Sequence, residues 1–353
     1  MEVGILQIFQ NYQGKKRDDE VVADELFIAK QADQLGFDKI WAAEHHFTDY
    51  SACPDNFTYL AMLAGCTENA KLGTGAVIVP WNDPLRVAEK IAFLDHLSNG
   101  RLVVGLGRGL ARVEYEHFGI DMGESRERFD EAARMILDAL DTGFIEGDGP
   151  FYPQVRTEIR PRPREGVRDR LYCVGMSPES VDQAALLGAR LMTFTQGPWE
   201  IYADGPLKQW QALYREHHGA PPPPLTGDLM YCHPDVKVAE ERGIDAMSEY
   251  FLTIVKHYEI MSDHFKTTKG YDAYASAAEA FKAVGLETAA RTYCGVNCWG
   301  DPERTLEQLR WRRELIGDFE LNVIAYYGSM TREEALASLE LFAREVLPEV
   351  QSW

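Results

Sequence analysis

The sequence predicts a single (β/α)8 barrel that spans residues 1–353, with excursions after its fourth and seventh strands. Short apolar runs alternate eight times with longer segments of helical periodicity. No break in composition divides the chain into halves, and 45% of its residues are apolar, enough for one large core. Eight strand–helix units of this kind favour a closed α/β barrel over an open, doubly wound sheet.

The eight apolar runs are the predicted strands. Parallel strands that are covered on both faces read as near-continuous apolar runs, and the first run has this character. In chain order, the strands are expected at Val3–Phe9, Lys39–Glu44, Lys71–Val79, Leu102–Leu106, Leu171–Val174, Leu191–Phe194, Leu229–Cys232 and Leu321–Ala325.

Start and stop residues mark the predicted helices. Gly36 ends a helix over 20–35, Asp83-Pro84 gives an N-cap followed by proline, and Thr331 with Glu334 forms a capping box. The other helices are expected at Pro54–Cys66, around Phe129–Leu140, near Glu179–Leu187 and at Pro302–Leu315. The segments Gly143–Arg168 and roughly 259–300 fit neither element and are the two predicted excursions.

Charge and cysteine content exclude several classes of function. The chain has 36 basic and 56 acidic residues, a net charge of −20, which repels nucleic-acid phosphates and anionic lipids. No run approaches the roughly 18 apolar residues of a membrane span, and no basic residue precedes the first apolar run as in a signal peptide. Six cysteines in so long a chain do not form a disulfide scaffold. We therefore expect a cytoplasmic protein with reduced thiols that binds neither nucleic acid nor membrane.

Two adjacent histidines follow the second strand, at the barrel end where such enzymes place their chemistry. His45 and His46 lie on an extended segment and point in opposite directions, so they do not readily share one metal, and no metal site is predicted. One of them is the acid/base group of a site, because imidazole titrates near neutral pH. The alternative is one buried, hydrogen-bonded histidine and one surface histidine.

Positive charge and a helix start mark a candidate phosphate site. The glycine-rich end of strand four does not match the dinucleotide fingerprint, since Leu110 occupies its last position, but it frames Arg108. Ser177, followed by proline, opens a helix with free amides, which is an anion site in many proteins. Together with Arg126, these residues predict a phosphate pocket in an otherwise acidic chain.

Several segments together resemble the bacterial luciferase-like flavin monooxygenase family. The spacing agrees almost without gaps from about residue 36 to 130, and similarity is looser elsewhere. The motifs that carry the resemblance are Trp41-x-x-Glu44-His45-His46-Phe47-Thr48, Leu72-Gly73-Thr74-Gly75-Ala76-Val77, Asp83-Pro84-x-Arg86, Leu94-Asp95-His96-Leu97-Ser98-Asn99-Gly100-Arg101 and Gly105-x-Gly107-Arg108-Gly109.

The resemblance implies a monooxygenase that uses reduced FMN (FMNH2) and O2, through a C4a-(hydro)peroxyflavin, to oxygenate a small organic substrate. A separate flavin reductase supplies the cofactor, and the helices after strands two and three form a homodimer. By the same resemblance, His45 is the catalytic histidine beside the flavin, where it handles protons. The residues that bind the cofactor are Gly75 and Ala76, joined by a cis peptide bond, Arg108, Glu114, Arg126, Met176, Ser177 and Ser180.

Two rival functions remain open, and the chain differs from the luciferase subunit at a reactive position. A deazaflavin-dependent oxidoreductase on the same barrel and a non-catalytic flavin-binding protein are the two rival functions. The luciferase subunit has a reactive cysteine where this chain has Gly107, which argues against light emission with a long-chain aldehyde. The candidates for an apolar cavity wall, which would be core residues otherwise, are Leu6, Phe47, Trp81 and Phe194. Nucleophilic and electrophilic oxygen transfer are both possible outcomes.

Overall fold

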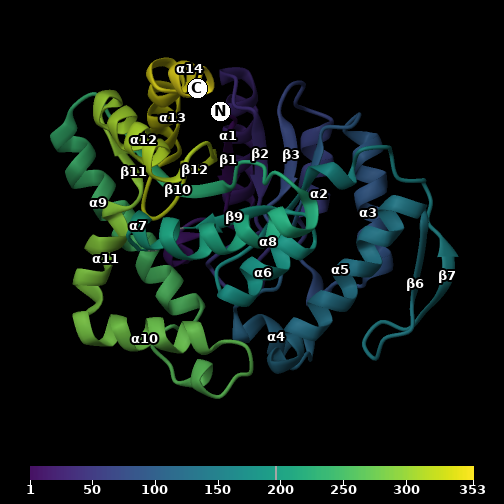
Figure 1. Cartoon of the computed structure of the whole chain (residues 1–353). Helices are drawn as coiled ribbons and strands as arrows, with labels where there is room; N and C mark the ends of the chain where they lie inside the picture. Colours follow the sequence, from purple (N-terminus) through teal and green to yellow (C-terminus); the bar gives the residue numbers. More distant parts are fainter. Residues whose placement is uncertain (195–196) are drawn as a thin grey trace.

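Eight parallel strands form the centre of the molecule (Figure 1). The computed structural model describes residues 1–194 and 197–353, and of residues 277, 280 and 281 only the backbone. The barrel strands are β1 (Val3–Gln7), β2 (Lys39–Ala42), β3 (Lys71–Thr74), β5 (Leu102–Gly107), β8 (Leu171–Val174), β9 (Arg190–Phe194), β10 (Leu225–Cys232) and β12 (Glu320–Ile324).

Each barrel strand pairs in parallel with a neighbour on either side. Strand β1 lies between β12 and β2, with Ile5 level with Val323 and with Ile40. Strand β10 pairs with β12 on one side and with β9 on the other, which closes the sheet. The (β/α)8 barrel expected from the sequence is therefore confirmed.

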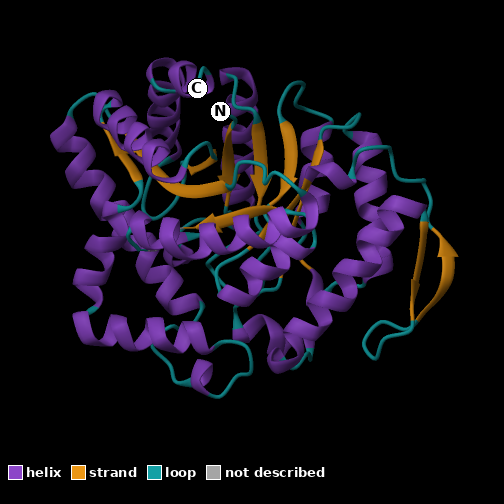
Figure 2. Ribbon diagram, viewed as in Figure 1, coloured by secondary structure: helices purple, strands orange, loops and turns teal. Residues whose placement is uncertain are grey.

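Helices surround the barrel on its outside (Figure 2). They are α1 (Asp18–Leu35), α2 (Asn56–Ala64), α3 (Pro84–Leu97), α5 (Ser125–Thr142), α6 (Pro178–Leu186), α7 (Trp199–Tyr202), α8 (Lys208–His218), α12 (Pro302–Ile316), α13 (Arg332–Glu345) and α14 (Leu347–Gln351). The predicted boundary signals hold: Gly36 caps α1 with a φ of 89°, Asp83 accepts a hydrogen bond from the Arg86 amide, and Thr331 and Glu334 form a capping box.

Both predicted excursions are present. The one after strand four holds the antiparallel hairpin of β6 (Phe144–Gly147) and β7 (Gln154–Glu158), which stands away from the barrel. The one after β10 begins earlier than predicted, with α9 (Val236–His257), and continues through α10 (Asp272–Val284), α11 (Leu286–Gly295) and β11 (Cys298–Gly300). A further helix, α4 (Arg112–Phe118), was not predicted and follows β5 directly.

Two strands differ from their predicted bounds for physical reasons. The third is interrupted after Thr74, and a short strand β4 (Val77–Ile78) continues it against β5. The seventh begins at Leu225 rather than Leu229. Its first half contains Asp228, which is buried and bound by Arg312 with Nη–Oδ distances of 2.9 and 2.5 Å. Because such an ion pair places a charged residue inside a strand, this part of the strand cannot be recognised from its hydrophobic pattern.

Side chains fill the barrel interior at its amino-terminal end. Lys39 Nζ lies 2.8 Å from Tyr172 Oη and 2.5 Å from Glu320 Oε2, and all three residues are buried. One layer further along, the buried ring of Trp41 packs so closely on Gly73 that a Cβ there would lie 2.3 Å from the ring. These layers of side chains plug the amino-terminal end of the barrel interior.

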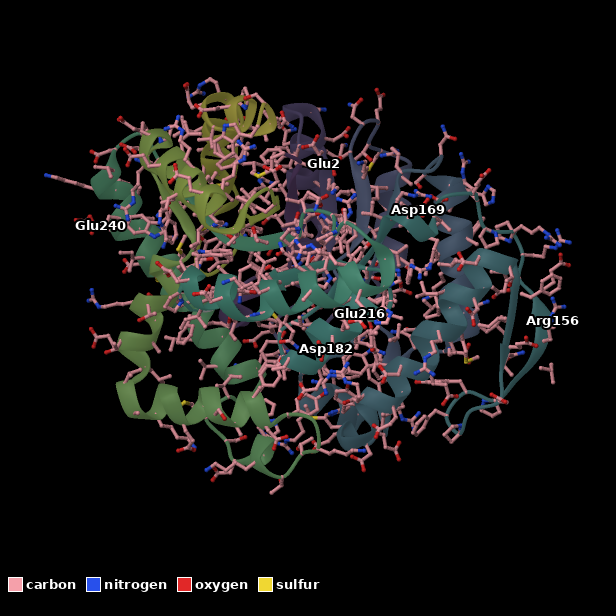
Figure 3. The ribbon with its side chains drawn as sticks, in the orientation of Figure 1. Glu2, Arg156, Asp169, Asp182, Glu216 and Glu240 are labelled. Atoms are coloured by element: carbon pink, nitrogen blue, oxygen red, sulfur yellow. The ribbon has the colours of Figure 1, made fainter. Side chains whose placement is uncertain are left out.

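Charged side chains cover the outer surface. In Figure 3, Asp182 and Glu216 lie on α6 and α8, and Arg156 lies on the β6–β7 hairpin. Among the described helices, none is both long and apolar enough to cross a membrane. The six cysteines are unpaired, and all but the half-buried Cys66 are buried.

Candidate active site

A cavity opens at the carboxyl ends of the barrel strands. It is lined by Leu6, Ile8, Ala43, Glu44, His45, Tyr50, Gly75, Ala76, Ile78, Gly107, Arg108, Gly109, Leu110, Glu114, Val174, Met176, Ser180, Phe194, Gly227, Leu229, Tyr250, Ile254, Tyr258, Tyr274, Tyr293 and Ile324. All but two of the predicted site residues are in this lining. The two others, Arg126 and Ser177, both contact Ser180 from behind it.

His45 and Glu114 form a direct contact at the cavity wall. His45 Nδ1 lies 3.1 Å from Glu114 Oε1, and the backbone N–H of His46 donates to the same oxygen at 2.8 Å. Tyr258 Oη lies 3.3 Å from His45 Nε2, on the other side of the ring. Glu114 is almost fully buried on α4, so its carboxylate is fixed against His45 from outside the barrel. This geometry suits an imidazole that gives and takes protons at Nε2.

A second imidazole lies behind this pair. His257 Nε2 is 3.8 Å from Glu114 Oε1, has no hydrogen-bond partner among the described residues, and its Nδ1 lies 3.0 Å from Thr48 Oγ1. Burial, aided by nearby His45, lowers the pKa of His257 to about 2, so this ring is neutral. One atom from each of His45, Glu114 and His257 falls within 4.8 Å of the other two, a set that could hold a metal ion. Glu114 Oε1 already has two partners, His45 Nδ1 and the His46 amide.

The two neighbouring histidines diverge as the extended backbone requires. His46 Nε2 turns to Glu44, 3.3 Å from its Oε1, and does not line the cavity. Glu44 also accepts hydrogen bonds from the Ile78 amide at 3.2 Å and from Trp81 Nε1 at 2.8 Å. His46 therefore belongs to a structural network, whereas His45 faces the cavity.

Two guanidinium groups meet at the far end of the cavity. Arg126 Nη2 donates to Ser180 Oγ at 2.9 Å, and burial together with Arg108 lowers the pKa of Arg126. Arg108 is 7% exposed, and its Nη1 donates to Gly270 O at 3.2 Å. Ser177 caps α6, accepting the Ser180 amide through its side chain. Two neighbouring guanidinium groups at a capped helix start are suited to binding an anion.

Small residues shape the cavity floor between these two ends. The peptide bond between Gly75 and Ala76 is cis, as the resemblance implied. A Cβ on Gly107 would lie 2.8 Å from Ile78 Cδ1 and 3.2 Å from Ala76 Cβ. Met176 lies beside them, and its sulfur accepts a hydrogen bond from the Phe194 amide at 3.3 Å. Gly75 and Gly107 lack a Cβ because the side chains of neighbouring residues, such as Leu6 at Gly75, pack directly on their backbone.

Some predicted wall residues are elsewhere. Leu6 and Phe194 line the cavity as expected. Phe47 is 56% exposed and stacks on His117, while Trp81 stacks on Phe118, so the prediction was wrong for both. Phe47 has a φ of 66°, which turns its side chain out of the strand direction. Alternation along a strand does not reveal such a turn.

Sequence reasoning missed the tyrosines of the cavity. Tyr50 follows β2, and the other four come from α9, from the residue after it, from α10 and from α11. They are Tyr250, Tyr258, Tyr274 and Tyr293. No local signal marks them, because they reach the cavity only when the excursion after β10 folds over the barrel mouth.

Comparison with known proteins identifies the family. A family model described as luciferase-like monooxygenase matches residues 1–318. The alkanal monooxygenase alpha chain of Aliivibrio fischeri is 26% identical over 324 residues, which cover 89% of this chain and 89% of that protein. The crystal structure of monooxygenase RslO1 from Streptomyces bottropensis superposes with a TM-score of 0.83 at 25% identity, covering 99% of both chains.

Two more distant structures share the fold and differ in cofactor. The oxygenating constituent of 3,6-diketocamphane monooxygenase from Pseudomonas putida, a type II Baeyer-Villiger enzyme in complex with FMN, gives a TM-score of 0.80 at 18% identity, covering 99% of this chain and 98% of that one. An F420-dependent secondary alcohol dehydrogenase gives 0.73 at 18%, with the same coverage. The match over most of its length shows that this chain belongs to the luciferase-like monooxygenase family.

Proposed function

We propose that this chain is a two-component monooxygenase that takes FMNH2 from a separate flavin reductase and oxygenates a small organic substrate with O2. The observation that carries this proposal is the cavity that joins His45 and Glu114 at one end to Arg108 at the other, where Arg126 contacts the lining residue Ser180. The whole chain, residues 1–353, would work as one barrel domain in the cytoplasm.

The cavity fits FMN at three points. Arg108, Arg126 and the helix start at Ser177 and Ser180 offer charge-assisted hydrogen bonds to a terminal phosphate. The isoalloxazine would lie over Gly75 and Ala76, beside Met176, where small residues line the floor. Glu114 would lie near the isoalloxazine, next to His45, which it contacts at 3.1 Å. In its reduced form, FMN supplies both electrons for O2, so that one oxygen atom enters the substrate and the other leaves as water.

The residues of the chain contribute proton control and water exclusion. Glu114 holds His45 by Nδ1, which leaves Nε2 toward Tyr258 and the cavity. A proton held at Nε2 can be given to, or withdrawn from, the oxygen that is being transferred. Apolar side chains cover most of the remaining wall and keep bulk water from the reacting atoms. Whether the oxygen is transferred to a carbonyl or to an electron-rich carbon depends on the substrate.

Two other functions fit the same cavity less well. A deazaflavin-dependent oxidoreductase is represented by the F420-dependent neighbour, at 18% identity. Oxidation of an alcohol by hydride transfer to a deazaflavin would also need a proton acceptor such as His45, so the preference between FMN and F420 distinguishes the two functions. A non-catalytic flavin-binding protein would have no use for a buried carboxylate that orients an imidazole.

Homodimerisation through α2 and α3 is part of the proposal. Three large apolar side chains are exposed on these adjacent helices: Met62 on α2, and Phe93 and Leu97 on α3. Exposed apolar side chains of this size, gathered on one face, mark an association surface. A second copy of the chain is the proposed occupant.

Rapid mixing tests the function. The chain is loaded with chemically reduced FMN under argon and mixed with oxygenated buffer, while the absorbance of oxidised flavin is followed. We expect oxidised flavin to return more slowly than from free FMNH2, and reduced FMN to bind more tightly than reduced F420 in equilibrium dialysis. Reoxidation at the rate of free flavin, or preference for F420, would overturn the proposal.

A further inference from the structure

Four tyrosines line the cavity toward its His45 end. They are Tyr50, Tyr250, Tyr258 and Tyr293, and we call them the tyrosine wall. Three of them come from the excursion after β10, on α9, directly after it and on α11. A fifth tyrosine of the lining, Tyr274, packs beside Tyr271, whose ring covers Arg108, and so belongs to the phosphate end. The tyrosine wall therefore faces the space that the proposed flavin leaves for the substrate.

The hydroxyl groups of the tyrosine wall are not equivalent. Tyr50 and Tyr250 satisfy each other with an Oη–Oη distance of 2.9 Å, and Tyr258 Oη contacts His45 Nε2 at 3.3 Å. The Tyr293 hydroxyl has no hydrogen-bond partner among the described residues. A phenol without a protein partner at the cavity wall can donate to an oxygen acceptor on the molecule that fills the cavity.

Charge limits what that molecule can be. Buried Glu114 lies at the His45 end of the cavity with the tyrosine wall, whereas Arg108 lies at the proposed phosphate end, so an anionic substrate on the tyrosine wall would meet like charge. Burial raises the pKa of Tyr293 well above its ordinary value, so this residue remains a phenol. The wall therefore offers aromatic faces and neutral hydrogen bonds.

We propose that the substrate is a neutral aromatic compound with oxygen on its ring, seated against the tyrosine wall, and not a straight-chain alkanal. Aromatic pairs gain more than the apolar area that they bury, which favours a ring over an aliphatic chain of equal carbon number. The hydroxyl of Tyr293 selects the ring oxygen. This inference rests on the proposed function, because the flavin must occupy the other side of the cavity.

Three ten-carbon probes separate these features: 2-naphthol, naphthalene and decanal. Their dissociation constants are measured by equilibrium dialysis against the chain saturated with oxidised FMN. We expect 2-naphthol to bind roughly 2- to 12-fold more tightly than naphthalene, the span of one hydrogen bond, and roughly tenfold more tightly than decanal. Decanal binding as tightly as 2-naphthol, or no binding of 2-naphthol at all, would overturn the inference.

One variant and its control locate the selectivity. In Tyr293→Phe, the advantage of 2-naphthol over naphthalene should disappear while naphthalene binding is kept. The control is Tyr214→Phe on α8, whose hydroxyl contacts Gly188 O at 3.4 Å, outside the cavity. An unchanged advantage in Tyr293→Phe would contradict the role of the tyrosine wall. FMN absorbance in the same samples shows separately whether the flavin site itself fails.

Discussion

His45 Nδ1 lies 3.1 Å from Glu114 Oε1, although the two residues are 69 positions apart in the sequence. The contact joins the end of β2 to α4, and its carboxylate is also fixed by the His46 amide. A carboxylate on one nitrogen of an imidazole sets which nitrogen faces the reaction. The catalytic proposal for His45 therefore depends on a tertiary contact rather than on the two-histidine motif alone.

We predict that His45→Ala lowers product formation by roughly 10²- to 10⁴-fold, the usual contribution of a general acid/base group. FMN affinity should change little, because Arg108 and Arg126 hold the phosphate end of the cavity. Single-turnover oxygenation by chain preloaded with FMNH2 measures the loss. Oxygenation at the parent rate would remove His45 from the mechanism.

His46→Ala is the matched control for that variant. Its imidazole contacts Glu44 and the ring of Phe118, with centroids 4.8 Å apart, and it does not line the cavity. We expect a lower melting temperature and nearly unchanged single-turnover oxygenation. If His46→Ala lost oxygenation while His45→Ala lost only thermal stability, the catalytic role would belong to His46.

Arg126→Ala should weaken FMN binding by roughly 10- to 150-fold, because a charge-assisted hydrogen bond contributes about 1.5–3 kcal/mol. Riboflavin, which lacks the phosphate, should bind as it does to the parent chain. Fluorescence titration with both ligands gives the comparison. Arg128→Ala, two residues further on α5 and paired with Glu124 at 2.8 Å, is the control. An equal loss for riboflavin would contradict a phosphate site.

Much of this site could be predicted because its residues sit where the chain itself signals a change of element. Arg108 follows a glycine-rich strand, and Ser177 precedes a proline at a helix start, so local patterns placed both at the barrel mouth. The positions of α4 and the tyrosine wall could not be predicted in this way. Contacts such as Tyr271 Oη to Gly109 O, at 3.1 Å across 162 residues, hold the second excursion over the cavity. Long-range packing of this kind produces no periodic pattern in the sequence from which it could be predicted.

Phe93→Glu should convert a dimer into a monomer if α2 and α3 form the proposed interface. A carboxylate at the centre of an apolar contact is costly to bury, whereas on the free surface it is tolerated. Sedimentation velocity over a range of concentrations reports the mass. Ile201→Glu is the control, since this side chain is 69% exposed outside that face. A parent chain that is monomeric at every concentration would count against the interface.

Asp228→Ala should lower the free energy of unfolding by about 3–5 kcal/mol, because it leaves the Arg312 charge buried without its partner. Chemical denaturation followed by circular dichroism measures the change. The control is Asp318→Ala, which removes an exposed partner of Arg313 and should cost about 1 kcal/mol at most. Equal losses in the two variants would show that burial does not set the cost.

The last prediction concerns Glu25, a fully buried carboxyl group on α1. Burial raises the pKa of Glu25 to about 7, although Gln7 Nε2 and the Phe9 amide donate to its two oxygens at 2.8 and 2.9 Å. The folded chain therefore binds a proton that the unfolded chain releases near pH 4.5, so the free energy of unfolding falls as pH rises from about 5 to 8. Glu25→Gln should remove up to roughly 3 kcal/mol of that fall, whereas exposed Glu68→Gln should keep it. Denaturation midpoints of the parent chain and the two variants at several pH values test this prediction. It would be refuted if the stability of Glu25→Gln fell with rising pH as steeply as that of the parent chain.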